Sequence, residues 1–163
     1  MKISLLAGAI NDVKFHPTLP HLLLSCSKDY SIRLWNSKNS TCVAIFAGIR
    51  GHRDEVLSID IAADGQKFIS GGIDHNIMVW SLDSEEINEK IVRSEDVESF
   101  GRGPFAARRL HFPEFSTRDV HGNYVDRLVY QSVIFIGLIL IFDFLSVSNG
   151  LATLSSRNLA RTT

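Results

Sequence analysis

The chain has 163 residues, of which 45% are hydrophobic and 21% are charged, and its formal net charge at pH 7 is −1. These values are ordinary for a folded domain or part of one, and they exclude a strongly basic nucleic-acid-binding protein. Cys26 and Cys42 lie in apolar runs and do not form a CxxC pair. We therefore expect reduced core thiols in an intracellular protein.

The first nine residues hold one lysine, a short apolar run and an Ala-Gly-Ala end. This composition allows a secretory signal peptide, although the run is about as short as such segments become. Cleavage there would release a chain that begins inside an apparent strand. We therefore favour an edge strand over a signal peptide.

Residues 22–35 and 67–80 repeat each other, and their two tryptophans are 45 positions apart. Each segment alternates apolar and polar residues, which is typical of half-buried strands. Each also contains a tight turn with an aspartate, a residue that accepts hydrogen bonds from nearby backbone. The matching residues are Ser25, Asp29, Ile32 and Trp35 in one segment and Ser70, Asp74, Ile77 and Trp80 in the other.

Further strands are predicted around these segments. Gly51-His52 precedes the alternating run 56–61, and Ala63-Asp64-Gly65 then supplies a hairpin turn. Residues 109–113 echo residues 13–17, a strand that ends at a proline, and His121 is followed by another alternating run. The sequence thus predicts units at about 9–36, 43–82 and 105–130, all within a domain over 1–130.

The order Gly-His, Ser, Asp, Trp is similar to the signature of the WD40-repeat family, whose period is roughly 40–45 residues. The resemblance implies an all-β fold, with about three blades of a seven-bladed propeller in this chain. In that family the four side chains form a hydrogen-bonded structural tetrad. Carried over, the tetrad residues are His52, Ser70, Asp74 and Trp80 in the second unit, Ser25, Asp29 and Trp35 in the first, whose histidine position falls near Leu6, and His121 in the third.

Two segments depart from the repeat. Residues 83–103 are acidic, and we expect an inter-blade insertion that forms a solvated loop or a short helix rather than an acidic site. Residues 131–163 form a divergent tail whose most apolar run is 133–142. Three interpretations remain open: translated non-coding sequence after a truncated gene model, which we favour, a membrane anchor, or buried propeller strands. The run is short of the ~20 apolar residues that a membrane helix requires.

Residues 22–36, 43–58 and 111–126 carry a narrower resemblance, which extends over about residues 9–129. They resemble the extra sex combs / embryonic ectoderm development family of Polycomb proteins. The resemblance implies a non-enzymatic, nuclear scaffold subunit of Polycomb repressive complex 2, which methylates lysine 27 of histone H3 and represses transcription. The implied partners are the catalytic methyltransferase subunit, other subunits of the complex and, for the full-length parent, the histone H3 tail.

The family reads trimethyl-lysine with an aromatic cage, because aromatic faces attract a quaternary ammonium. The cage aromatics belong to blades outside this segment, so we expect this chain not to read methyl-lysine well. The resemblance implies that six of its residues lie on the rim of the reader face: Asn11, Lys28, Glu55, Arg118, Tyr124 and Asp126.

The sequence contains no catalytic motif and no Cys/His grouping with metal spacing, and we expect no cofactor and no direct contact with nucleic acid. Two alternatives stay open. A generic WD40 adaptor would use the same propeller in another complex, although the segment 111–126 argues against it. A membrane-anchored fragment would use residues 133–147, and we regard this as the weaker alternative.

Overall fold

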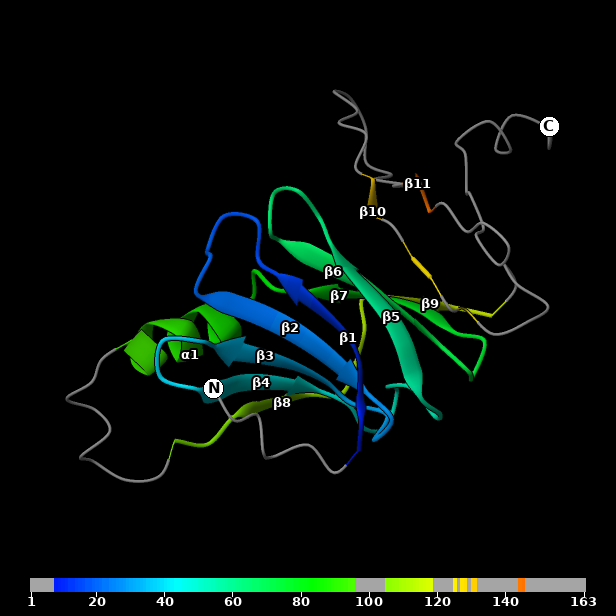
Figure 1. The fold of residues 1–163 in the computed structure, drawn as a ribbon, viewed down its shortest axis with the longest axis horizontal. Helices are drawn as coiled ribbons and strands as arrows, with labels where there is room; N and C mark the ends of the chain where they lie inside the picture. Colours follow the sequence, from blue (N-terminus) through cyan, green and yellow to red (C-terminus); the bar gives the residue numbers. More distant parts are fainter. Residues whose placement is uncertain are drawn as a thin grey trace.

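The computed structural model describes residues 8–95, 105–118, 125, 127–128, 130–131 and 144–145. Within these residues the chain forms a five-stranded sheet, a four-stranded sheet and a short strand pair, with a helix against the edge of the five-stranded sheet (Figure 1). The strand orders are β1-β2-β3-β4-β8 in the first sheet and β5-β6-β7-β9 in the second.

The first sheet is built from consecutive antiparallel strands and one strand from much later in the chain. Its consecutive strands are β1 (Ile10–Phe15), β2 (Leu22–Ser27), β3 (Ile32–Asn36) and β4 (Thr41–Phe46). The late strand is β8 (Arg108–Leu110), which pairs in parallel with β4. β2 is buried along its whole length, which explains its nearly continuous apolar sequence.

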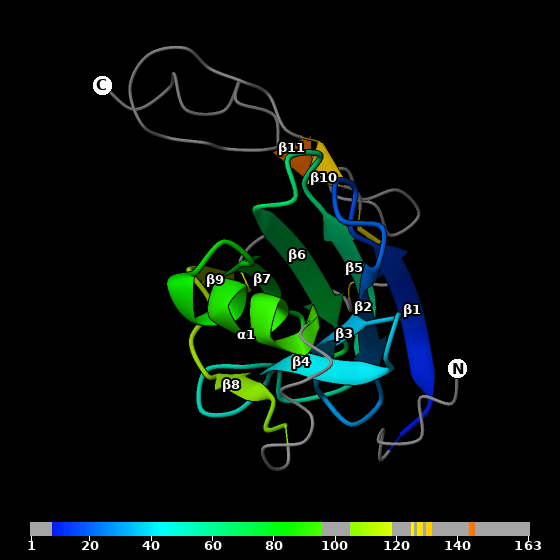
Figure 2. The same cartoon turned by 90° about the vertical axis from the view of Figure 1, so that its left-hand side faces the viewer.

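The second sheet repeats this meander. Its strands are β5 (Val56–Ile61), β6 (Lys67–Gly72), β7 (Ile77–Ser81) and β9 (Phe115–Thr117), and each pairs antiparallel with the next. β1 and β5, the first strands of the two sheets, lie side by side (Figures 1 and 2). The side chain of Lys14 in β1 reaches Asp60 in β5, with 3.5 Å between Nζ and Oδ1.

The two sheets pack face to face around one apolar core. Phe46 of the first sheet stands edge-on to Phe68 and to Trp80 of the second, with ring centroids 4.8 and 5.6 Å away. Phe68 and Trp80 are stacked on each other at 6.2 Å. This aromatic contact joins neighbouring units of the repeat, because alternate residues of each strand point into the space between the sheets.

The helix α1 (Glu85–Glu95) lies within the acidic segment that was expected to be a solvated loop or a short helix. It is not simply solvated, because Ile87 is fully buried in the core between the sheets. Ser94 Oγ accepts a hydrogen bond of 2.9 Å from Asn36 Nδ2, and its carbonyl accepts one from Asn39. The helix therefore returns from the second sheet and binds the β3–β4 hairpin of the first (Figure 2).

The third unit differs from a simple continuation of the repeat. β8 completes the edge of the first sheet and β9 that of the second, because the outer edges of β4 and β7 carry backbone groups that need partners. Val125 and Leu128, both buried, pack against Gly71 on the outer face of the second sheet. Leu128 N donates a 3.0 Å hydrogen bond to Ser58 Oγ.

Little of the tail belongs to the described residues. β10 (Tyr130–Gln131) pairs antiparallel with β11 (Phe144–Leu145). The apolar run 133–142, and with it the choice between the three interpretations of the tail, lies outside the described residues. Within the part of the chain that the structure describes, no helix is long and apolar enough to cross a membrane.

Candidate functional site

The tetrad residues of the second unit are joined by hydrogen bonds across the second sheet. His52 precedes β5 and lies 2.9 Å from Asp74 through Nδ1 and 2.8 Å from Ser70 Oγ through Nε2. Trp80 Nε1 donates to the same Ser70 oxygen at 3.0 Å. These contacts link the segment before β5, strand β6, the β6–β7 turn and strand β7, and all four residues are buried.

Asp74 is held as an anion inside this network. Burial alone would raise its pKa, but the hydrogen bond to His52, the charge of His52 and donors from Arg53 and Asn76 together bring the pKa well below its ordinary value. The backbone N–H of Arg53 donates to Oδ2 at 2.8 Å and that of Asn76 to Oδ1 at 3.1 Å. One carboxylate therefore orders both the loop before β5 and the β6–β7 turn.

The first sheet keeps part of the same arrangement. Trp35 Nε1 donates to Ser25 Oγ at 2.9 Å. Asp29 binds Arg33, with 2.8 Å between Oδ2 and Nη2, and also accepts from the hydroxyl of Ser31 at 2.5 Å. Arg33 thus supplies a cation to the turn aspartate of the first unit. The expected histidine position near Leu6, and His121 of the third unit, lie outside the described residues.

Four of the six residues expected on the reader rim can be located, and they lie at one end of the two sheets. Lys28 follows β2, Glu55 precedes β5 and Arg118 follows β9, while Asn11 lies in β1 beside the start of β5. The strand registers bring these ends together, since Ile10 pairs with Ser27, Val56 with Gly72 and Ile77 with Thr117. Tyr124 and Asp126 lie outside the described residues.

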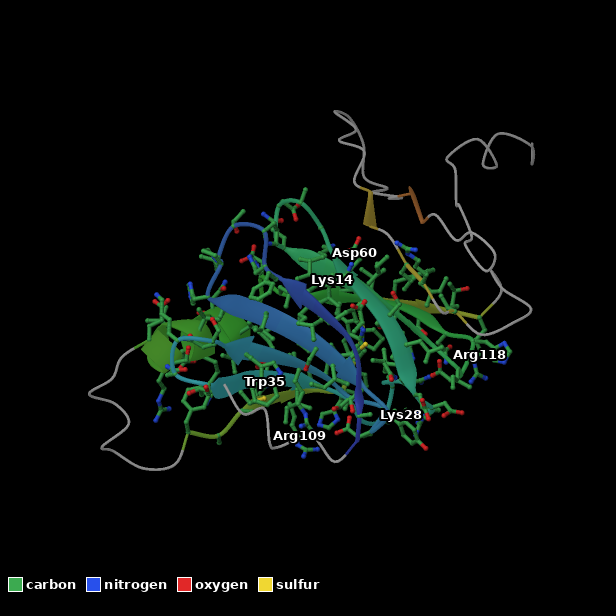
Figure 3. All side chains as sticks on the ribbon, viewed as in Figure 1. Lys14, Lys28, Trp35, Asp60, Arg109 and Arg118 are labelled. Atoms are coloured by element: carbon green, nitrogen blue, oxygen red, sulfur yellow. The ribbon has the colours of Figure 1, made fainter. Side chains whose placement is uncertain are left out.

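We call this end the turn face, and we define it by Asn11, residues 28–31, Glu55, residues 73–76 and Arg118. Lys28 and Arg118 mark it in Figure 3. Lys28 Nζ lies 3.2 Å from Glu55 Oε2, and Asn11 Nδ2 donates to the carbonyl of Val56 at 2.8 Å, so both contacts bridge the two sheets. Arg118 Nε donates to Asn76 Oδ1 at 3.2 Å. Among the residues predicted for the rim, Lys28 and Glu55 therefore hold each other in place, whereas Asn11 and Arg118 are held by Val56 and Asn76.

Two further residues of the turn face were not singled out from the sequence. Tyr30 and His75 follow the two turn aspartates at equivalent positions, with φ angles of 67° and 62°, and both are exposed. Non-glycine residues seldom adopt such angles, and they do so most often in turns or at functional positions. The repeated order Asp, aromatic residue, Ser or Asn was the available signal.

The described residues contain no group of three or more His, Cys, Asp or Glu side chains that could hold a metal ion. Cys26 and Cys42 are free thiols. The arrangement at the turn face is one of paired charges, amides and exposed aromatic rings. Such a surface suits recognition of a partner.

Comparisons with known proteins agree with this geometry. The family model described as "WD domain, G-beta repeat" matches residues 3–36 and 40–81, which contain strands β1 to β7 of the two sheets. The Polycomb protein esc of Drosophila virilis is 50% identical over 119 residues, which are 72% of this chain and 28% of that protein. The Polycomb group protein FIE1 of rice (Oryza sativa subsp. japonica) is 36% identical over 121 residues, which are 73% of this chain and 25% of that protein.

The chain belongs to the esc family of WD40-repeat Polycomb proteins. It spans about 28% of the length of the curated esc relative that it matches. A solved structure titled as a humanized mutant of the Chaetomium thermophilum Polycomb Repressive Complex 2 bound to the inhibitor GSK343 contains a similar chain. The similarity has a TM-score of 0.60 at 27% identity and covers 76% of this chain and 24% of that one. The prediction of an all-β WD40 fold, in which this chain forms part of a propeller, is confirmed.

Proposed function

We propose that this chain acts as a non-enzymatic scaffold segment of a Polycomb repressive complex 2 and supports methylation of histone H3 lysine 27 in the nucleus. The observation that carries the proposal is the 50% identity with an esc protein over 119 residues, which are 72% of the chain. A generic WD40 adaptor would need to match only the repeat signature, whereas this identity extends beyond the tetrads.

The partners proposed for the parent protein are the catalytic methyltransferase subunit and the histone H3 tail. The turn face supports a peptide-binding role, because it offers a cation at Lys28, an anion at Glu55 and a free ring at Tyr30 within one surface. The aromatic cage that reads trimethyl-lysine is expected on other blades. We therefore propose that these residues form the rim of a reader site and do not bind methyl-lysine without the cage.

Retention of the catalytic subunit from nuclear extract tests the scaffold proposal. The tagged full chain should retain that subunit, and a chain with the core substitution Leu24→Asp, which puts a carboxylate into the fully buried β2, should not. Circular dichroism establishes that the unmodified chain is folded in the same preparation. Failure of the folded chain to retain the subunit would contradict the proposal.

A methylation assay tests the non-enzymatic part separately. The purified chain, incubated with histone H3 and a labelled methyl donor, should transfer no methyl group, whereas a complete Polycomb complex in a parallel reaction should. Transfer by the chain alone would overturn this part of the proposal while leaving the scaffold role open to the retention experiment.

A further inference from the structure

A cavity of about 500 Å³ opens beside the second sheet, at the outer border of the turn face. One wall is the loop between β4 and β5, and the other is the segment that runs from β8 through β9. Six of the side chains that line the cavity carry the argument that follows: Ile49, Arg50, Arg53, Phe112, Phe115 and Arg118.

The two walls are connected by backbone hydrogen bonds. Ala47 N donates to the carbonyl of Leu110 at 3.0 Å, and Arg50 N donates to that of His111 at 3.1 Å. The ring of His111 lies directly over Gly48, whose φ is +125°, and a Cβ at Gly48 would be 2.1 Å from His111 Nδ1. The wall that carries Arg50 is therefore preformed, because only glycine allows this close approach.

The floor of the cavity is connected to the tetrad. The carboxylate of Asp74 holds the backbone N–H groups of both Arg53 and Asn76. The amide oxygen of Asn76 in turn accepts from Arg118 Nε. The buried network of the second sheet thus holds the backbone of Arg53 and, through Asn76, the side chain of Arg118, so less ordering remains to be done when a ligand binds.

The cavity combines cations with exposed apolar groups. Among the described residues, no carboxylate forms an ion pair with Arg50, Arg53 or Arg118. The one carboxylate on the wall, Glu114, is paired with Lys67 at 2.7 Å. Three apolar side chains around the arginines are at least half exposed: Phe112 at 67%, Ile49 at 66% and Phe115 at 51%.

The geometry points to a docking site for an acidic peptide segment of a partner protein, with carboxylates over the three arginines and an apolar side chain between Phe112 and Phe115. Guanidinium groups bind carboxylates with two parallel hydrogen bonds, and aromatic rings supply the apolar contact area. Exposed apolar groups of this size favour a protein partner.

This ligand differs in charge from the basic histone tail proposed for the turn face, and the two sites share only Asn76 and Arg118. The inference does not rest on the function proposed above. Nucleic acid fits this site less well. The chain has 17 basic against 18 acidic residues, and the three arginines lie together with apolar side chains in a single pocket.

Fluorescence anisotropy of the full chain tests the inference with three labelled ten-residue peptides. One peptide has aspartates and glutamates around a central Leu-Phe pair, the second replaces the acids by their amides, and the third replaces them by lysine. We expect the acidic peptide to bind at least about tenfold more tightly than the others, with an affinity that falls as salt is raised.

The double variant R50E/R53E should weaken binding of the acidic peptide about tenfold or more, and Phe112→Ala should weaken it several-fold. The control is R109E, which makes half of that charge change, in β8 and away from this cavity (Figure 3). Circular dichroism of each variant reports whether it is folded. Because Phe112 is largely exposed, its truncation provides a folded variant even if R50E/R53E unfolds.

Four outcomes would overturn the inference. The amide peptide could bind as tightly as the acidic one, R109E could weaken binding as much as R50E/R53E, or Phe112→Ala could leave binding unchanged. In the fourth outcome, an oligouridine binds more tightly than the acidic peptide and competes with it, which would show that the ligand of this site is a nucleic acid and not a peptide. None of these results bears on retention of the methyltransferase subunit.

Discussion

The Nδ1 atom of His52 lies 2.9 Å from Oδ1 of Asp74, and both side chains are almost completely buried, at 1% and 2% exposure. The same carboxylate accepts two backbone N–H groups, so its removal leaves several buried donors without a partner. This single contact connects the stability of the second sheet with the order of the turn face.

Asp74→Ala should lower the free energy of unfolding by about 3 kcal/mol, because His52 and two backbone N–H groups lose their acceptor in a buried site. Urea unfolding followed by circular dichroism measures the change. Asp64→Ala is the control, since Asp64 is exposed and, among the described residues, accepts only the N–H of Gln66, at 2.9 Å. The control should cost less than about 1 kcal/mol. Equal losses in the two variants would contradict the role given to Asp74.

Asp74 should also make the fold sensitive to acid. Its pKa in the folded chain lies below the ordinary value of 3.8, so the unfolded chain binds a proton at a pH where the folded chain does not. The stabilisation is complete above pH 3.8 and is lost as the pH falls below it. The unfolding free energy of the unmodified chain should therefore fall more steeply below pH 4 than that of Asp74→Asn, by up to about 1.4 kcal/mol per pH unit. Parallel profiles would exclude this linkage.

A histidine connects the two sheets at the end opposite the turn face. His16 Nδ1 accepts the N–H of Leu19 at 3.1 Å, so Nε2 carries the proton and donates to the carbonyl of Gly65 at 3.0 Å. Gly65 has a φ of +77°, and a Cβ there would lie 2.3 Å from His16 Cε1. Both facts make Gly65 difficult to replace.

Gly65→Ala should destabilise the chain by about 2 kcal/mol or more, through the positive φ and the clash with the imidazole ring. In a His16→Ala background the clash is removed, and only the cost of the positive φ at residue 65 remains. A double-mutant cycle from urea unfolding should therefore give a coupling of at least about 1 kcal/mol. Additive effects would show that the ring does not press on Gly65.

The two cysteines should differ in reactivity. Burial raises the pKa of Cys26 to about 12, with the charge of Asp12 adding to the effect, whereas burial raises the pKa of Cys42 to about 11. Because the thiolate is the reactive form, the folded chain should react slowly with a thiol reagent at pH 8, and Cys42 should react before Cys26. In denaturant both should react at the rate of a free thiol. Mass spectrometry of timed samples would reveal any reversal of this order.

The two-sheet meander could be predicted from the sequence because its determinants are local. Alternating residues and the repeated aspartate turn define β2–β3 and β6–β7, and the order of His52, Ser70, Asp74 and Trp80 pointed to residues that lie within hydrogen-bond distance. The ion pair of Asp29 with Arg33 could not be assigned in the same way. Arg33 stands where the second repeat has Met78, so the repeat pattern itself says nothing about its role.

The edge strands were not predictable from local pattern either. Residues 109–113 look like the start of a new unit, yet β8 extends the first sheet and β9 the second. Which sheet each strand joins depends on which strand edge is still unpaired when the segment folds, and this is a property of the assembled sheets. The acidic composition of residues 83–103 likewise did not indicate that α1 has a buried face, which contains the fully buried Ile87.

The pairing of β4 with β8 has a consequence for the order in which the chain folds during synthesis. A ribosome makes β5, β6, β7 and α1 before it makes the residues that cover the edge of β4. Until Arg108–Leu110 leave the exit tunnel, the nascent first sheet carries an open edge that can pair with another chain. The sheet that is translated first thus stays incomplete while most of the second sheet is made, and its protection in the cell depends on how quickly the residues from Ala47 to Leu110 follow.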